Sequence, residues 1–185
     1  EIYGTLGAVQ LVRGDHRQAE AAFKRAVEAD PSSAQAHLAL ANFYLATGNQ
    51  AATEASLRAA IGLEPQHVLA NRALAYFYIG AGRAAEAEPY LKLAAEASSD
   101  ASGQMGLAEY YVSQRRMEDA RQWFERVAAG KDRLAPTARV RLATLDFTAG
   151  NLAEATRRID EILTSDPSNT RALTARAELL AARGD

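Results

Sequence analysis

Few residues of this sequence belong to types, at spacings, that could do chemistry. It contains no cysteine and three histidines, His16, His37 and His67. No two of these histidines have the i, i+4 spacing by which one face of a helix holds a zinc ion. We therefore interpret all three as structural and expect neither a metal site nor a cofactor.

The other chemically suggestive groups lack the context that their chemistry needs. Gly80-Ala81-Gly82 does not follow a strand pattern, so it does not fit a phosphate-binding loop. No serine lies in the strand-to-helix turn of a hydrolase nucleophile. Neighbouring acids such as Glu118 and Asp119 are typical of a solvated helix surface. The sequence therefore predicts a protein that is not an enzyme, with no catalytic residues.

Charge and hydropathy argue against two classes of partner. The 185 residues carry a net charge of -2, and the arginines are scattered among acids. Without a basic patch we expect no nucleic-acid binding. No apolar run reaches the roughly eighteen residues of a membrane span, so we expect no direct membrane insertion. Frequent arginine and alanine-rich segments favour a bacterial source, and a cysteine-free chain fits a bacterial cytoplasm or periplasm equally.

The elements that must position any binding residues are indicated by an internal repeat. In the stretch 34–67, Tyr44 follows Ala41 by three residues, Gly48 by seven and Pro65 by twenty-four. The position of Ala41, which we call the small slot, recurs at intervals of 34, 34, 33, 35 and 34 residues. The six small slots are Gly7, Ala41, Ala75, Ala108, Ala143 and Ala177. The glycine seven residues after the slot is replaced in the fourth copy by Arg115.

This period, with its small, aromatic, glycine and proline positions, resembles the tetratricopeptide repeat (TPR) family. The resemblance implies an all-α, right-handed superhelical solenoid of antiparallel helix pairs, each a helix A followed by a helix B. We expect a single solenoid over residues 1–185, with units at about 1–33, 34–67, 68–100, 101–135 and 136–169 and a final helix at 170–183. The sequence begins without methionine and inside a helix pattern, so we expect a fragment of a longer chain.

Local signals mark the helix boundaries and two irregularities. The predicted N-caps are Asp15 (with Gln18 at capping-box spacing), Ser32 or Ser33, Asn49, and Asn151 (with Glu154 at the same spacing). Pro89 lies inside a predicted helix B and should bend or loosen its early turns. The stretch 128–133 follows the fourth unit and precedes the 35-residue interval, which predicts a loosened joint with a local change in superhelical pitch.

In the TPR family, A helices line a concave groove that binds partners. The resemblance places groove positions three residues before the small slot and one, four and five residues after it. The partner-binding residues that we expect are Asn42, Arg72, Tyr76, Met105, Glu109, Thr144 and, next to a groove position, Arg141. For four apolar groove residues we favour a packing role: Leu45, Ile79, Val112 and Phe147. No three successive A helices carry the basic and amide set of the family's dicarboxylate clamp, which disfavours binding of a chaperone's C-terminal carboxylate.

These observations favour a non-catalytic scaffold for protein-protein interaction, which binds a partner peptide or helix in the concave groove. Two alternatives stay open at this point. The repeats could be the substrate-recruiting arm of a larger enzyme, such as a glycosyltransferase or a peptidase. They could also form a spacer that self-associates.

Overall fold

The computed structural model describes residues 2–97 and 101–183, except for the side chains of residues 182 and 183. The predicted unit edges at residue 1 and at residues 98–100 lie outside the described residues. Within the described ranges the chain forms eleven α-helices and no strand. The helices are α1 Ile2–Val12, α2 His16–Ala29, α3 Ala34–Ala46, α4 Gln50–Leu63, α5 Val68–Gly80, α6 Ala84–Ala97, α7 Ala101–Ser113, α8 Met117–Ala129, α9 Ala135–Thr148, α10 Leu152–Ser165 and α11 Thr170–Arg183.

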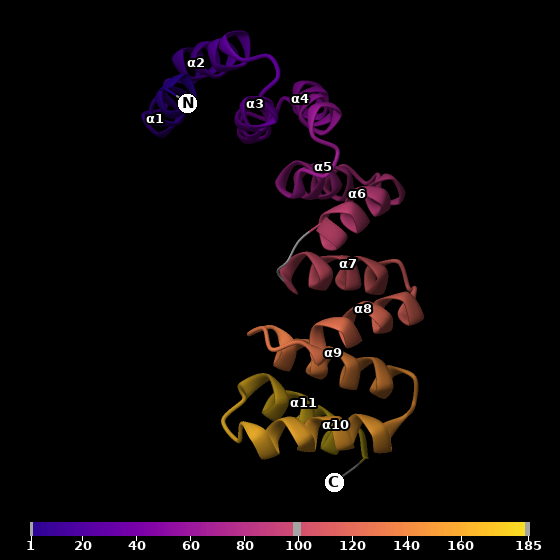
Figure 1. Ribbon diagram of the computed structural model, residues 1–185. Coiled ribbons are helices and arrows are strands. Elements are labelled where there is room, and N and C mark those ends of the chain that lie inside the picture. The colour runs from indigo at the N-terminus through magenta and orange to yellow at the C-terminus, as the bar shows by residue number, and fades with distance from the viewer. Residues whose placement is uncertain (1, 98–100, 184–185) are drawn as a thin grey trace. The chain divides into compact units, whose positions relative to one another are not determined.

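The helices group into two compact units, residues 1–97 (unit 1) and 98–185 (unit 2). In unit 1, α1 packs on α2, α3 on α4 and α5 on α6, and successive pairs stack through α2 on α3 and α4 on α5 (Figure 1). In unit 2, α7 packs on α8, α9 on α10 and α11, and α8 on α9. Each unit is therefore a stack of helix pairs, as the repeat predicts. The prediction of one solenoid over the whole chain stays a prediction.

Each helix pair closes through a three-residue turn that needs a left-handed backbone. Gly14, Gly48, Gly82 and Gly150 adopt φ values between 74° and 82° in these turns. Glycine tolerates this conformation because it has no Cβ. In the turn between α7 and α8, Arg115 adopts φ of 58° instead. The fourth unit thus keeps the turn of its neighbours although its residue disfavours that backbone.

The core is built on the small slots and the leucines that precede them. Ala41, Ala75, Ala108 and Ala143 are at most 2% exposed, and so allow the paired helix to approach closely. At the first slot, a Cβ on Gly7 would lie 2.9 Å from the Phe23 ring, so glycine is the residue that fits there. From helix B, Leu57, Phe124 and Ile159 are buried against these positions.

Three of the predicted N-caps are confirmed and one is wrong. Asp15 accepts a hydrogen bond from the Gln18 amide at 3.2 Å, Ser33 from Ala36 at 3.1 Å, and Asn49 from Ala52 at 3.2 Å. Asn151 is the N-cap residue of α10 but its side chain makes no capping bond. The capping box fails there because the Glu154 carboxylate is held by Arg157 and Arg158 on its own helix.

The predicted loosened joint at 128–133 is also wrong. Helix α8 continues to Ala129 and packs on α9, with a five-residue connection between them. The B helices begin 34, 34, 33 and 35 residues apart, so the insertion moves a boundary by one residue and no more. Around Pro89 the helix α6 is continuous from Ala84 to Ala97.

A polar contact recurs where helix B of one repeat meets helix A of the next. The Tyr44 hydroxyl donates to Glu20 at 3.2 Å, and 34 residues later the Tyr78 hydroxyl donates to Glu54 at 3.0 Å. At the equivalent positions of unit 2 the chain has Arg121 and Asp146, which form a salt bridge of 2.7 Å. Unit 2 therefore keeps this link between repeats but with its charge reversed.

Candidate functional site

The polar residues predicted for the groove of unit 1 lie on one face of its A helices. Helix α5 places Arg72 and Tyr76 one turn apart on the same face, and α3 presents Asn42 at the register position of Tyr76. Tyr76 is half exposed, Asn42 is exposed and Arg72 is partly buried. Among the side chains that the structure describes, none forms a hydrogen bond or ion pair with these three. Their polar atoms are therefore available to a ligand.

An apolar hollow lies beside these groups. Leu45 is 54% exposed and Ile79 38% exposed, so the packing role predicted for them is wrong. They point away from the core because helix α5 turns Leu74, Phe77 and Tyr78 inward, which leaves the opposite face to Tyr76 and Ile79. The hollow has a volume of about 440 Å³. Its lining residues are Leu45, Gly48, Gln50, Thr53, Ala73, Tyr76, Phe77, Gly80 and Ala81.

In unit 2 two of the predicted residues satisfy each other. Arg141 on α9 donates through its Nε atom to the Glu109 carboxylate on α7, at 2.7 Å. Met105, also on α7, is partly buried. Thr144 is exposed, and its hydroxyl donates to the carbonyl oxygen of Val140 at 3.1 Å. Val112 and Phe147 are partly buried, and Phe147 packs against the core of unit 2 as predicted.

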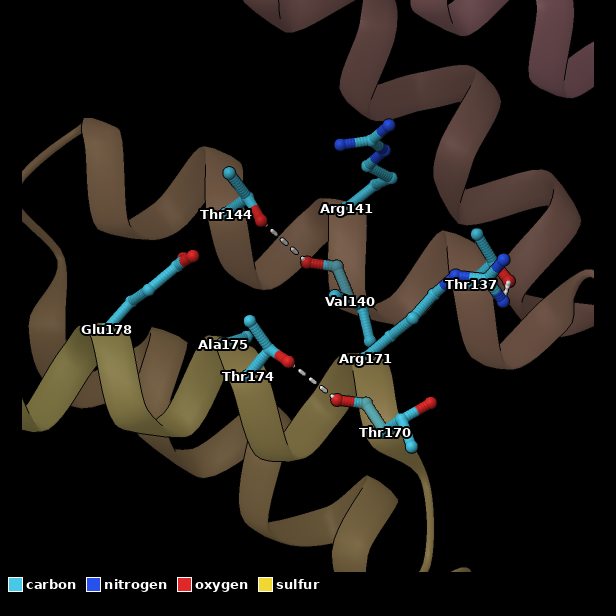
Figure 2. Close-up of a pocket in the computed structure, with 9 residues that line it drawn as sticks. All are labelled: Thr137, Val140, Arg141, Thr144, Thr170, Arg171, Thr174, Ala175 and Glu178. Carbon is cyan, nitrogen blue, oxygen red and sulfur yellow. Dashed lines mark hydrogen bonds between the residues drawn. The ribbon is translucent and has the colours of Figure 1, made fainter.

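A second hollow, of about 350 Å³, lies between α9 and α11 (Figure 2). It contains the predicted residues Arg141 and Thr144 together with residues of α11 that the sequence analysis did not single out. The lining residues are Thr137, Val140, Arg141, Thr144, Thr170, Arg171, Thr174, Ala175 and Glu178. A register signal for Glu178 was present, because it follows the small slot Ala177 as Asn42, Tyr76, Glu109 and Thr144 follow theirs.

The sequence analysis also missed a buried ionic cluster in unit 2. Asp146 is 3% exposed and its carboxylate binds Arg121 on α8 and Arg158 on α10, each at 2.7 Å. Two cations thus neutralise one buried carboxylate, which also connects α8, α9 and α10. The available signal was an aspartate at the position that holds tyrosine in the second, third and fourth repeats. We interpret the cluster as structural because its groups satisfy one another.

The contacts between repeats in unit 1 shift the pKa values of their groups. Hydrogen bonds from Arg83, at 2.6 and 3.3 Å, lower the pKa of Glu54 below its usual value, and the Tyr78 hydroxyl adds to this. Burial raises the pKa of Tyr78. A hydrogen bond from Lys24 lowers the pKa of Glu20 in the same way. All these groups keep their ordinary ionisation near neutral pH, so the shifts point to stability and not to catalysis.

The histidines lie at structural positions. The Nδ1 atom of His67 accepts the Ala70 amide at 3.2 Å and caps α5, and His37 contacts the Pro31 carbonyl at 3.3 Å. Among the described residues there is no group of three or more His, Asp or Glu placed to hold a metal ion. Within the same ranges no helix is long and apolar enough to cross a bilayer.

Comparison with known families decides the nature of the repeat. A family model described as tetratricopeptide repeat matches residues 11–53, and a second model of the same description matches residues 94–138 and 140–185. The chain belongs to the tetratricopeptide-repeat family. TPR proteins act in general as protein-protein interaction scaffolds and are generally non-catalytic.

Solved TPR structures share the fold. One is pilF of Pseudomonas aeruginosa, which is 23% identical over 100% of this chain and 84% of its own, with a TM-score of 0.71. Another is YrrB, described as a TPR protein with an unusual peptide-binding site, which is 18% identical over 95% of this chain and 90% of its own, with a TM-score of 0.70. A TPR protein of Parabacteroides merdae is 18% identical over 98% of this chain and 73% of its own, with a TM-score of 0.72. No curated protein sequence matches the chain.

Proposed function

We propose that this TPR protein is a non-catalytic scaffold that binds a partner segment, extended or helical, on the A-helix face of unit 1. The observation that carries the proposal is the unpaired set of Asn42, Arg72 and Tyr76 beside the exposed side chains of Leu45 and Ile79. In such a site apolar contact supplies affinity, and a few hydrogen bonds fix the register of the partner.

The chemistry of the face defines the partner segment. The hollow beside Leu45 and Tyr76 fits a bulky apolar side chain. The Arg72 guanidinium fits a carboxylate or a carbonyl oxygen, because it presents only donors and has no partner in the free protein. Asn42 offers both a donor and an acceptor on the neighbouring helix.

The predicted residues of unit 2 contribute less in this proposal. A ligand that engaged Glu109 or Arg141 would first have to break their 2.7 Å salt bridge. A partner segment gains less from groups that already satisfy each other than from unpaired ones. We therefore give Arg72 and Tyr76 a larger share of the binding energy than Glu109, Arg141, Met105 or Thr144.

The likeness to YrrB, a TPR protein described as having a peptide-binding site, is consistent with peptide binding on this fold. Absence of catalysis in this chain belongs to the same proposal. The two rival functions, an arm of a larger enzyme and a self-associating spacer, stay predictions of the sequence analysis. No contact among the described residues favours either over partner binding.

Affinity capture from a native lysate tests the proposal. The bait is the full chain, compared with an Arg72→Ala/Tyr76→Ala double variant. The matched control is Arg25→Ala/Glu28→Ala, which removes two exposed side chains of α2, a B helix. We expect the parent and the control to retain the same partner and the groove variant to lose it by about tenfold or more. Equal retention by all three, with unchanged helical circular dichroism, would contradict the proposal.

A further inference from the structure

The hollow between α9 and α11 carries two unpaired charges of opposite sign. Arg171 reaches toward Thr137, whose hydroxyl oxygen lies 3.4 Å from its Nη1 atom. Glu178 projects from the same helix at the other end of the hollow (Figure 2). Among the side chains that the structure describes, neither has an oppositely charged partner within 4.0 Å. Both are exposed, so each is available to a charged group of a ligand.

The floor between the two charges offers hydrogen-bond acceptors. The Thr144 hydroxyl donates to the Val140 carbonyl at 3.1 Å, and the Thr174 hydroxyl donates to the Thr170 carbonyl at 2.9 Å. Each hydroxyl has spent its proton on its own helix and keeps lone pairs. Figure 2 places Thr174 between Arg171 and Glu178, with Thr144 facing it from α9. Backbone N–H groups of a peptide are the complementary donors.

The size of the hollow selects an extended ligand. Arg171 and Glu178 are seven residues apart, which corresponds to about 10.5 Å along the helix axis. A helical ligand of that length and about 10 Å in diameter has a volume of roughly 800 Å³. The hollow holds about 350 Å³, which is less than half of that. In an extended polyproline-II segment, residues i and i+3 lie on the same side about 9.3 Å apart, close to the spacing of the two charges.

We propose that the α9–α11 hollow of unit 2 binds an extended peptide segment in which an acidic and a basic residue are separated by two others. The carboxylate of the segment pairs with Arg171 and its cation pairs with Glu178. The order of the two residues sets the direction of the peptide in the hollow. This inference goes beyond the proposed function, because it concerns other helices and a ligand of different chemistry from the apolar segment assigned to unit 1.

Labelled synthetic peptides test the charge pattern by fluorescence anisotropy at low ionic strength. The probes are two end-capped peptides that contain Glu-Pro-Ala-Lys or Lys-Pro-Ala-Glu, and a third of equal composition in which Glu and Lys are adjacent. The proteins are the full-length parent and the double charge reversal Arg171→Glu/Glu178→Arg. The matched control is Arg25→Glu/Glu28→Arg, which makes the same reversal at two exposed positions of α2. All variants are checked for unchanged helical circular dichroism.

We expect the parent and the control to bind one order of the spaced peptide about three times or more tighter than the other order and the adjacent pair. The double reversal should prefer the opposite order, because both pairings change sign. Equal affinity for both orders in the parent, or an unchanged preference in the reversal, would overturn the inference. Loss of the preference in the Arg72→Ala/Tyr76→Ala variant would also overturn it, because the peptides would then bind in unit 1.

The two proposals fail separately. An order preference that is absent from the parent, together with a partner lost by the Arg72→Ala/Tyr76→Ala variant, leaves the function proposed for unit 1 intact and removes this one. An order preference that reverses as expected, together with a partner retained by that variant, does the opposite.

Discussion

At the scale of single residues, Arg115 stores conformational strain. It adopts φ of 58°, where the other described turns between paired helices have glycine. A left-handed backbone costs an L-residue with a side chain about 1–2 kcal/mol, and glycine loses part of that gain through its larger freedom in the unfolded chain. We expect Arg115→Gly to raise the free energy of unfolding by about 0.5–1 kcal/mol, as measured by urea denaturation.

The matched control is Gly48→Ala, at the equivalent turn with φ of 78° and open space around a new Cβ. It should lower the free energy of unfolding by about 1 kcal/mol, since only backbone strain is introduced. An Arg115→Gly variant no more stable than the parent would show that this turn is not strained.

Asp146 is the residue whose loss should harm unit 2 most. It is 3% exposed and neutralises Arg121 and Arg158, which keep about a fifth to a quarter of their side chains exposed. Removing one member of a buried ion pair leaves uncompensated charge, and the partial exposure of the arginines puts the effect at the lower end of the usual range. We expect Asp146→Ala to lower the free energy of unfolding by about 3 kcal/mol.

The comparison variant is Asp119→Ala, which breaks an exposed salt bridge to Arg116. It should change the free energy of unfolding by less than about 1 kcal/mol. Urea denaturation of both variants separates the two cases, and an equal effect of the two substitutions would contradict a structural role for the Asp146 cluster.

The roles of single residues were only partly predictable from the sequence. Register identified Asn42, Arg72 and Tyr76 as groove residues, and the structure places all three free of partners on one face. Leu45 and Ile79 were assigned to packing because apolar residues at helical spacing are usually core, whereas here the opposite face of each helix fills the core. The Glu109–Arg141 pair was not foreseeable, because it depends on the distance between two helices.

At the scale of elements, the contact between α4 and α5 should make stability depend on pH. The Arg83 hydrogen bonds lower the pKa of Glu54 from its model-compound value of 4.5. A carboxyl whose pKa is lower in the folded state stabilises the fold above its unfolded pKa, and this contribution is lost as the pH falls through the folded value. Glu20, Glu86 and Glu154 have pKa values lowered by the same kind of contact.

We therefore expect the urea midpoint to be constant from pH 7 to about pH 5 and to fall below about pH 4.5. Glu54→Gln should be less stable than the parent at pH 7, and the difference should shrink as the pH falls below 4.5. A difference that stays constant down to pH 3 would show that the Glu54 charge does not stabilise the fold.

Helix boundaries were largely predictable because the signals that set them are local. Asp15, Ser33 and Asn49 cap their helices as their residue types predict. Asn151 has the same type and spacing, but arginines one turn beyond Glu154 compete for the carboxylate that would complete its capping box. Such competition between side chains is not visible in a three-residue spacing.

At the scale of the whole molecule, each compact unit has a core of its own. Unit 1 contains three helix pairs and buries Leu57, Leu74 and Tyr78 to 1% exposure or less. About three repeats are sufficient for a stack of this kind to be stable. We expect residues 1–97 to fold alone, with a helical circular dichroism spectrum and a cooperative thermal transition. A fragment that is unfolded at room temperature would contradict this independence.

The central claim, that the A-helix face of unit 1 binds a partner segment, is tested most directly by site-specific photo-crosslinking. A Tyr76→p-benzoylphenylalanine variant of the full chain is irradiated in native lysate, beside a variant with the same replacement at Arg25 on the exposed face of α2. We expect one adduct at position 76, absent at position 25, whose cross-linked peptide carries a bulky apolar residue near an acidic one. The same adducts at both positions, or none at position 76 while the parent retains a partner, would contradict the claim.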